Sequence, residues 1–381
     1  MKRKEENKYF LLLYYILAAF ITLAVIITLN TASFSTHRYY DIQISASNKA
    51  LNAMEMLKEK EAELSKNYDY GDFYENYEDK VYYDSVNLNT GMIGAEYTAI
   101  TTTIGNLDSK ITSLDPNFTA VYIKMFNKLS LKKGDEIVIN MSGSFPMLDI
   151  SCMIAAEEYG LKPFIMTSVG ASSYGATNPA FTIFDMLEYL YEKGIVKHRI
   201  SIVSLGGSSD IGENFGEFND YHDRELIIDR INKSGIKFLY EKKFDTNIEK
   251  RLEIINEHCD DVKLFVNIGG NSVGIGINEN AYYQSNGILY AKNYKQTSNT
   301  HAGEGLIIKF LSSGVNTIQM LNIKDIALEY GLEYGINKLP EVGVGEAYYD
   351  VSYNLTYPII SIVVVIAFLI YYKKKRLFKE I

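Results

Sequence analysis

Short loops rich in glycine and serine recur along the chain, each directly after a short apolar run. They lie at residues 142–144, 170–175, 206–212 and 269–274. Their hydroxyls and backbone amides are groups that hold an oxyanion without a lysine. One such loop is typical of a tight turn between a strand and a helix, but four of them indicate a binding site for carboxylates or similar oxyanions.

The predicted ligand-binding positions come from these four loops and from one polar segment that precedes them. That segment, 101–110 within the longer stretch 92–116, is placed to cover the ligand edge of the sheet, although its spacing is equally typical of a capped turn with Asn106 or Asp108 as N-cap. The predicted ligand-binding residues are Thr101, Thr102, Thr103, Asn106, Lys110, Ser142, Gly143, Ser144, Gly170, Ser172, Ser173, Gly206, Gly207, Gly269, Gly270 and Asn271.

Nucleophilic catalysis by a loop serine is the alternative chemistry. Neither the loop at 142–144 nor the loop at 170–175 has the Gly-x-Ser-x-Gly spacing of a nucleophile elbow. Two histidines, His222 and His301, fall in predicted loops and are able to reach the same edge of a sheet. The catalytic residue therefore stays open, with a Ser208/Asp210/His222 arrangement among the alternatives. The candidates are Ser144, Ser172, Ser173, Ser208, Asp210 and His222.

Other ligand classes lack their sequence patterns. None of the four loops has the Walker spacing for a nucleoside triphosphate or the Gly-x-Gly-x-x-Gly spacing for a dinucleotide. The chain has no His-x-x-x-His and no Cys-x-x-Cys, and its Asp220, His222 and Asp223 are typical of a solvated loop. The sequence therefore predicts neither a cofactor nor a metal site.

The elements that position the loops alternate between strands and helices. Apolar β-branched runs at 137–141, 164–169, 200–205, 264–268 and 317–321 predict strands, and helical spacing lies between them. A strand, a helix and a similar strand form a parallel unit whose loops share the carboxyl edge of the sheet. The expected fold is an α/β domain with a doubly wound, Rossmann-like, mostly parallel sheet.

Apolar runs near both ends predict two transmembrane helices, at 9–29 and 355–372. Basic residues lie outside each run, so both termini are expected in the cytoplasm and the main domain outside it, in a two-pass protein of the cell membrane. The remaining segments are a cytoplasmic tail at 1–8, a stalk helix and Tyr-rich acidic linker at 30–91, an extracytoplasmic α/β domain at 92–350 and a basic cytoplasmic tail at 373–381.

The net charge of the chain limits which classes of molecule it is expected to bind. The formal net charge is −9, and because the two tails carry +2 and +4, the region between them carries −15. Such a charge argues against binding of nucleic acid. The two cysteines allow at most one disulfide, and Cys152 lies on the apolar side of a predicted helix, where a buried free thiol is expected.

The loops and the segments around them resemble the family of poly-gamma-glutamate system proteins over about residues 92–346. The resemblance implies a role in the bacterial machinery that makes and exports poly-γ-glutamate, but it brings no established catalytic residue. The sequence departs from the expected pattern after Gly207, where Ser208, Ser209 and Asp210 stand in place of further glycine. The resemblance is carried by 101–107, 134–136, 142–146, 168–176, 205–207, 266–270 and 321–331.

The expected function is that of a membrane-anchored accessory component of poly-γ-glutamate synthesis or export. Its partners would be the polymer or the synthase and exporter subunits, bound through the Gly/Ser loops. The alternative is an amidohydrolase or transpeptidase that trims or transfers γ-glutamyl chains with a loop serine. A receptor for a small molecule is a third, more distant interpretation, because the predicted tails are too short to hold a signalling domain.

Overall fold

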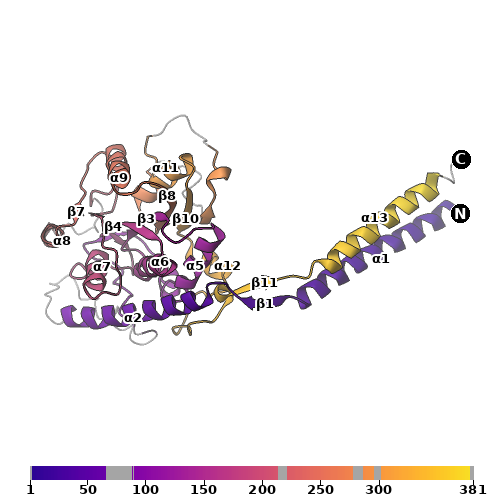
Figure 1. The fold of residues 1–381 in the computed structure, drawn as a ribbon, viewed down its shortest axis with the longest axis horizontal. Coiled ribbons are helices and arrows are strands. Elements are labelled where there is room, and N and C mark those ends of the chain that lie inside the picture. The colour runs from indigo at the N-terminus through magenta and orange to yellow at the C-terminus, as the bar shows by residue number, and fades with distance from the viewer. Residues whose placement is uncertain are drawn as a thin grey trace. The chain divides into compact units, whose positions relative to one another are not determined.

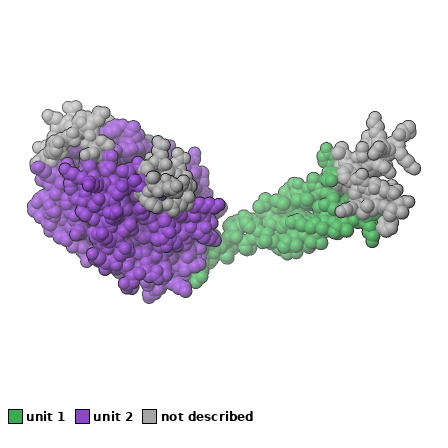
Figure 2. All heavy atoms as spheres, turned by 90° about the horizontal axis from the view of Figure 1, so that it is seen from above, with its two compact units in different colours: residues 1–38, 349–381 green, residues 39–348 purple. Residues whose placement is uncertain are grey.

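The computed structural model describes residues 2–65, 88, 90–212, 221–277, 286–295 and 302–377. The predicted Tyr-rich linker at 67–84 lies outside these residues. The chain divides into two compact units, coloured green and purple in Figure 2. Unit 1 consists of Met1–Arg38 with Tyr349–Ile381, and unit 2 is Tyr39–Tyr348.

Unit 1 joins the two ends of the chain. In it, α1 (Lys2–Asn30) contacts α13 (Thr356–Leu377), and β1 (Ser33–Thr36) pairs antiparallel with β11 (Tyr349–Ser352) (Figure 1). Ser33 Oγ and Ser352 Oγ lie 2.6 Å apart across this pair. The strand pair therefore fixes the first and last parts of the chain to each other.

The structure contradicts the predicted transmembrane helices at 9–29 and 355–372. Among the residues that it describes, no helix has both the length and the apolar character needed to cross a bilayer. The prediction of a two-pass membrane protein with cytoplasmic termini and an extracytoplasmic domain is overturned with it.

Unit 2 is built on a seven-stranded sheet with the strand order β7-β6-β4-β3-β8-β10-β9. The apolar run of Ile137 to Met141 forms the buried part of its central strand. The strands are β3 (Glu136–Ser142), β4 (Lys162–Ser168), β6 (Ile202–Ser204), β7 (Lys237–Phe238), β8 (Val262–Ile268), β9 (Gly287–Leu289) and β10 (Asn316–Met320).

The sheet is mixed, which corrects the expected fold class. Strands β7, β6, β4, β3, β8 and β10 pair in parallel, whereas β9 pairs antiparallel with β10. The strands that follow β3 along the chain extend the sheet on one side as far as β7, and β8 then starts the other side. The direction of winding thus changes between β3 and β8, which is where open α/β sheets have their ligand crevice.

Helices cover both faces of this sheet, with α9 and α11 on one side and α5, α6 and α7 on the other (Figure 1). A typical one is α6, which starts with Pro146 and ends before Gly160, whose φ of 89° suits a residue without a side chain. The helices of this unit are α2 (Tyr40–Ser65), α4 (Leu107–Thr112), α5 (Phe118–Lys128), α6 (Pro146–Tyr159), α7 (Ile183–Glu192), α8 (Tyr221–Ser234), α9 (Phe244–His258), α10 (Ser272–Ile275), α11 (Leu306–Ser312) and α12 (Ile323–Glu329), with the 3-10 turns η3 (Ala291–Asn293) and η4 (Glu346–Tyr348).

Helix α2 packs within unit 2, whereas the sequence predicted a separate stalk. Its Ala46, Ala50 and Leu57 are fully buried, and the helix contacts α5 and α6. The buried side chain of Gln43 donates hydrogen bonds to the carbonyls of Ala120 and Ala347, at 3.0 and 2.9 Å. The helix is therefore part of the α/β domain.

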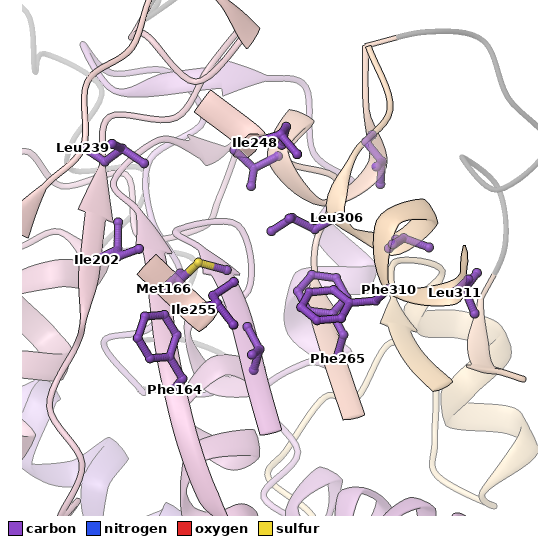
Figure 3. Packing of buried hydrophobic residues seen from close by; sticks show 14 of the residues in the cluster. Phe164, Met166, Ile202, Leu239, Ile248, Ile255, Phe265, Leu306, Phe310 and Leu311 are labelled. Atoms are coloured by element: carbon purple, nitrogen blue, oxygen red, sulfur yellow. The ribbon is translucent and has the colours of Figure 1, made fainter. Parts of the chain in front are cut away.

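The core on the α9 and α11 side joins the sheet to these two helices (Figure 3). At its centre Phe265 of β8 stacks on Phe310 of α11, with ring centroids 4.6 Å apart. Ile248 and Ile255 bring α9 into the same cluster, which also holds Met166 of β4. Burial of these side chains fixes the sheet that positions the loops.

We predict that Phe265→Ala lowers the free energy of unfolding by about 3–5 kcal/mol, because truncation leaves a cavity beside the Phe310 ring. The matched control is Leu328→Ala, since Leu328 on α12 is 58% exposed and its loss should cost about 0.5 kcal/mol or less. Urea unfolding of both variants measures the difference. Equal losses would contradict this description of the core.

Candidate functional site

The four Gly/Ser loops meet at the carboxyl edge of the sheet, because β6, β4, β3 and β8 are parallel neighbours. Backbone bonds join the loops to one another. Gly170 N donates to the Leu205 carbonyl at 2.8 Å, and Gly143 N donates to the Gly170 carbonyl at 3.2 Å. The fourth loop reaches the third through Ser272 Oγ, which donates to the Gly207 carbonyl at 3.3 Å. The structure thus brings all four loops together around the change of winding.

A small parallel ladder places the polar segment 101–110 on the second loop. In it, β2 (Thr101–Thr103) pairs with β5 (Ala171–Ser172). Ser173 N donates to the Thr103 carbonyl at 2.9 Å, and Thr102 Oγ1 donates to the Ala171 carbonyl at 3.1 Å. Two polar groups of the segment, Thr102 Oγ1 and the Thr103 carbonyl, are thus used in holding it to the second loop. The buried side chain of the segment is that of Lys110, at its other end.

Lys110 lies at the centre of a buried cluster, with 2% of its surface exposed. Its Nζ donates to Ser172 Oγ at 2.6 Å and to the carbonyl oxygen of Ser144. The same Nζ lies 4.0 Å from the centre of the Phe145 ring. The segment that carries Lys110 approaches the second loop closely because residue 105 is glycine, since a Cβ there would lie 2.4 Å from the Ser173 carbonyl oxygen. The side chain is therefore fixed against the first and second loops together.

Burial lowers the pKa of Lys110 from 10.5 to about 7, while the nearby carboxyl of Asp149 acts in the opposite direction. Burial also raises the pKa of Asp149, on α6, well above its usual range. Both oxygens of Asp149 are buried without a hydrogen-bond partner among the described residues. A substantial fraction of Lys110 is therefore neutral near pH 7 and able to accept a proton.

The serines of the first two loops differ in their surroundings. Ser144 Oγ accepts a hydrogen bond from the backbone N–H of Ser172 at 3.1 Å. Ser172 and Ser144 keep 7% and 9% of their surface exposed, whereas Ser173 has none. Ser142 Oγ is buried and has no partner in the described part of the chain. Among the described residues, Ser172 is the predicted nucleophile with a basic side chain at hydrogen-bonding distance, that of Lys110.

A row of amide side chains runs across β3, β8 and β10, in the direction away from β4 and the second loop. Asn140, Asn267 and Gln319 occupy one register across β3, β8 and β10. Asn140 Nδ2 donates to Asn267 Oδ1 at 2.6 Å, and Asn267 Nδ2 donates to Gln319 Oε1 at 2.7 Å. Asn140 Nδ2 also donates to Asn271 Oδ1 at 2.8 Å. The row leads directly to the fourth loop.

Two donors at the ends of this row are unused. Gly274 N donates to Asn271 Oδ1 at 2.8 Å, which fixes the orientation of that amide and leaves Asn271 Nδ2 buried without a partner in the described structure. Gln319 Nε2 is likewise buried without a hydrogen-bond partner among the described residues. Gly269 (φ 87°) lets the fourth loop pass close to the first, because a Cβ there would lie 3.0 Å from Ser142 Oγ. Buried donors without partners are costly, so they indicate a place for an acceptor.

Asp210 has a structural position, which argues against its predicted catalytic role. Its carboxylate accepts from Arg251 Nη2 at 2.6 Å, from Ser204 Oγ at 2.7 Å and from Asn247 Nδ2 at 3.1 Å. Asp210 and Arg251 are both 1% exposed. The negative charge that the sequence places in the third loop is thus neutralised inside the protein.

The remaining predicted residues lie at the margin of the site. Thr103, Asn106, Ser208 and Gly270 are exposed, and Asn106 caps α4 by accepting from Ser109 N at 2.9 Å. The loop backbone of Gly206 and Gly207 has positive φ, at 79° and 74°. His222 is the second residue of α8, but its side chain lies outside the described part of the structure, as does His301.

Sequence reasoning missed one motif and three buried amides. Gly270-Asn271-Ser272-Val273-Gly274 has the Gly-x-Ser-x-Gly spacing directly after β8. In the structure Ser272 begins the short helix α10 without the positive φ of a strained elbow, and its hydroxyl is bonded to the Gly207 carbonyl. The signal for the amides is a polar residue inside an apolar strand, as at Asn140 in Ile-Asn-Met and Asn267 in Val-Asn-Ile.

Comparisons of the chain with protein-family profiles, with curated proteins and with solved structures found no match. The resemblance to poly-gamma-glutamate system proteins therefore remains a prediction. What the site can do chemically rests on its own geometry, which combines unused buried donors with a lysine and a serine in contact.

We predict that Asp210→Ala lowers the free energy of unfolding by about 3–5 kcal/mol, because Arg251 is left as a buried unpaired charge. The double variant Asp210→Ala/Arg251→Met removes both charges and should recover part of this loss. Urea unfolding of the two variants measures the coupling. A single variant that is no less stable than the double variant would refute the structural role of this ion pair.

We also predict a pH-dependent stability that Lys110 causes. Between pH 7 and 10.5 the unfolded chain holds a proton on Lys110 that the folded protein has released, so folding becomes more favourable as the pH rises. The stability of the wild type relative to Lys110→Met should therefore increase from pH 7 to 8.5, by up to about 1.4 kcal/mol per pH unit. Urea unfolding at several pH values tests this, with the exposed Lys233→Met as a control that should give a constant difference.

Proposed function

We propose that the carboxyl edge of the sheet binds a chain that is rich in carboxylate and carbonyl oxygens. The observation that carries the proposal is a pair of buried donors that have no partner among the described residues, Asn271 Nδ2 in the loop after β8 and Gln319 Nε2 on β10. An acceptor oxygen from a ligand would satisfy them, which offsets the cost of their burial. Ser142 Oγ, at the end of β3, is a third buried polar group without a partner in the described structure.

The resemblance in the loop sequences leads us to propose poly-γ-glutamate as this ligand. Each unit of that polymer carries one carboxylate and one amide carbonyl, which are both acceptors. We propose that the protein is an accessory component of the synthesis or export of the polymer, which it would serve by holding the chain or by engaging the synthase that produces it.

The charge of the protein does not prevent this binding. Its formal net charge is −9, which repels a polyanion at long range. At physiological salt that repulsion is screened over about 8 Å, whereas hydrogen bonds from buried donors act at contact. Asp210, the acid of the third loop, is already paired with Arg251. Binding is therefore expected to depend on local donors more than on the overall field.

We predict that Asn271→Asp weakens the binding of poly-γ-glutamate at least about tenfold. The change keeps the acceptor that caps α10 but replaces the unused donor with an oxygen that repels a carboxylate, and a hydrogen bond to a charged group is worth about 1.5–3 kcal/mol. Fluorescence anisotropy of labelled polymer with the full-length protein gives the dissociation constants.

The control is Asn232→Asp, which adds the same charge at an exposed position of α8. It should leave the dissociation constant within about twofold of the wild-type value, because an exposed charge away from the loops is screened. Equal affinity of the Asn271→Asp variant and the wild type would remove the basis for this site. Absence of any polymer binding by the wild type would refute poly-γ-glutamate as the ligand.

A further inference from the structure

The contact between Lys110 and Ser172 has the geometry of a serine activated by a lysine. Nζ lies 2.6 Å from Ser172 Oγ, and the carbonyl of Ser144 and the ring of Phe145 hold the amine in place from other directions. A base at hydrogen-bonding distance from a hydroxyl is what nucleophilic catalysis by serine requires. Lysine replaces histidine as that base in some serine hydrolases.

The surroundings of Lys110 favour its neutral form. The pKa of Lys110 is about 7 because of burial, and the charged group that acts on it is Asp149 of α6. Burial holds the pKa of Asp149 well above its usual range, so this carboxyl does not supply a full counter-charge. Tyr122 of α5 and Cys152 of α6 lie in the same buried region, and their pKa values are raised, so both stay neutral at pH 7.

We propose that Ser172 is a nucleophile and Lys110 its general base, in an acyl transfer that starts from an ester or an amide. The inference deepens the proposed function and rests on it for the natural substrate, because it assigns a reaction to the same edge of the sheet. All three residues are buried, and the two serines keep slightly more of their surface exposed than the lysine does, at 7% for Ser172 and 9% for Ser144 against 2% for Lys110.

The reaction balances with these groups alone. Ser172 Oγ attacks the carbonyl carbon while neutral Lys110 takes the hydroxyl proton, and the C–N or C–O bond to the leaving group then breaks as Lys110 returns the proton to the departing amine or alcohol. An acyl ester of Ser172 remains. Water or a second amine attacks this ester, Lys110 again takes the proton, and the proton passes to Ser172 Oγ as the free serine is restored.

Ser144 is a positioning residue in this scheme. Its Oγ accepts the backbone N–H of Ser172 at 3.1 Å, and its carbonyl accepts from Lys110. One residue thus fixes both the backbone that carries the nucleophile and the amine of the base. Because its Oγ accepts that N–H, the hydroxyl proton of Ser144 is free to turn toward a substrate oxygen.

The experiment is labelling of the full-length protein with a fluorophosphonate probe, followed by mass spectrometry of its peptides. We expect one adduct, on Ser172, formed at a rate that rises with pH around a midpoint near 7. Lys110→Met should lower that rate at least about 100-fold, as expected for loss of a general base. Lys110→Arg places a permanently protonated side chain there, which cannot act as a base, and should be equally slow, whereas Ser172→Ala should give no adduct at that position.

Ser45→Ala, at an exposed position of α2, is the control and should label like the wild type. Circular dichroism of each variant checks that it is folded, and the pH profile of the wild type needs no variant at all. An adduct on Ser272 in place of Ser172, a flat pH profile, or no adduct on folded wild type would each overturn the inference.

The outcomes separate this inference from the proposed function. Polymer binding that is lost in Asn271→Asp, together with no adduct on Ser172, would leave the binding proposal standing and refute the dyad. An adduct on Ser172 that requires Lys110, together with no polymer binding, would support the dyad for another acyl substrate and refute the polymer as ligand.

Discussion

Parallel pairing of β6, β4, β3 and β8 is the constraint on which the rest of unit 2 depends. Because these strands run in one direction side by side, each loop that follows them must emerge at the same edge. The loops then bond to one another, as Gly143 N does to the Gly170 carbonyl. The hydrophobic core around Phe265 and Phe310 keeps the strands in this register, so packing far from the edge determines the geometry at the edge.

Buried polar groups of the same domain fall into two kinds, those whose hydrogen bonds are satisfied and those whose hydrogen bonds are not. Around Asp210 the carboxylate, Arg251 and their neighbours satisfy one another, which is the condition for a buried ion pair to be tolerated. Around Lys110 and Asn271 some buried polar atoms are left without hydrogen bonds. The carboxyl oxygens of Asp149 and Asn271 Nδ2 have no partners within the described structure. Unsatisfied buried groups at the carboxyl edge, next to the change of winding, are what the binding proposal rests on.

The sequence predicts the parts of this arrangement that depend on local pattern. The expected strands at 137–141 and 264–268 lie within β3 and β8, since apolar β-branched runs specify buried strands. The antiparallel strand β9 has only three residues and no such pattern. The place of Lys110 depends on pairing between β2 and β5, which are far apart in the chain, and no local pattern gives that register. The prediction of transmembrane helices is wrong for the residues that the structure describes.

Binding of a carboxylate and catalysis by Lys110 make opposite demands on charge. A carboxylate beside Lys110 would raise its pKa and keep it protonated, which would remove the base. The structure separates the two demands, because the unused amide donors lie on one side of the first loop and the dyad lies on the other. The first and fourth loops pass close to each other at Gly269, where a Cβ would be 3.0 Å from Ser142 Oγ and 3.5 Å from the Cβ of Ser144. Binding of a carboxylate is therefore compatible with the dyad only where the ligand places that charge on the Asn271 side of the first loop, away from Lys110.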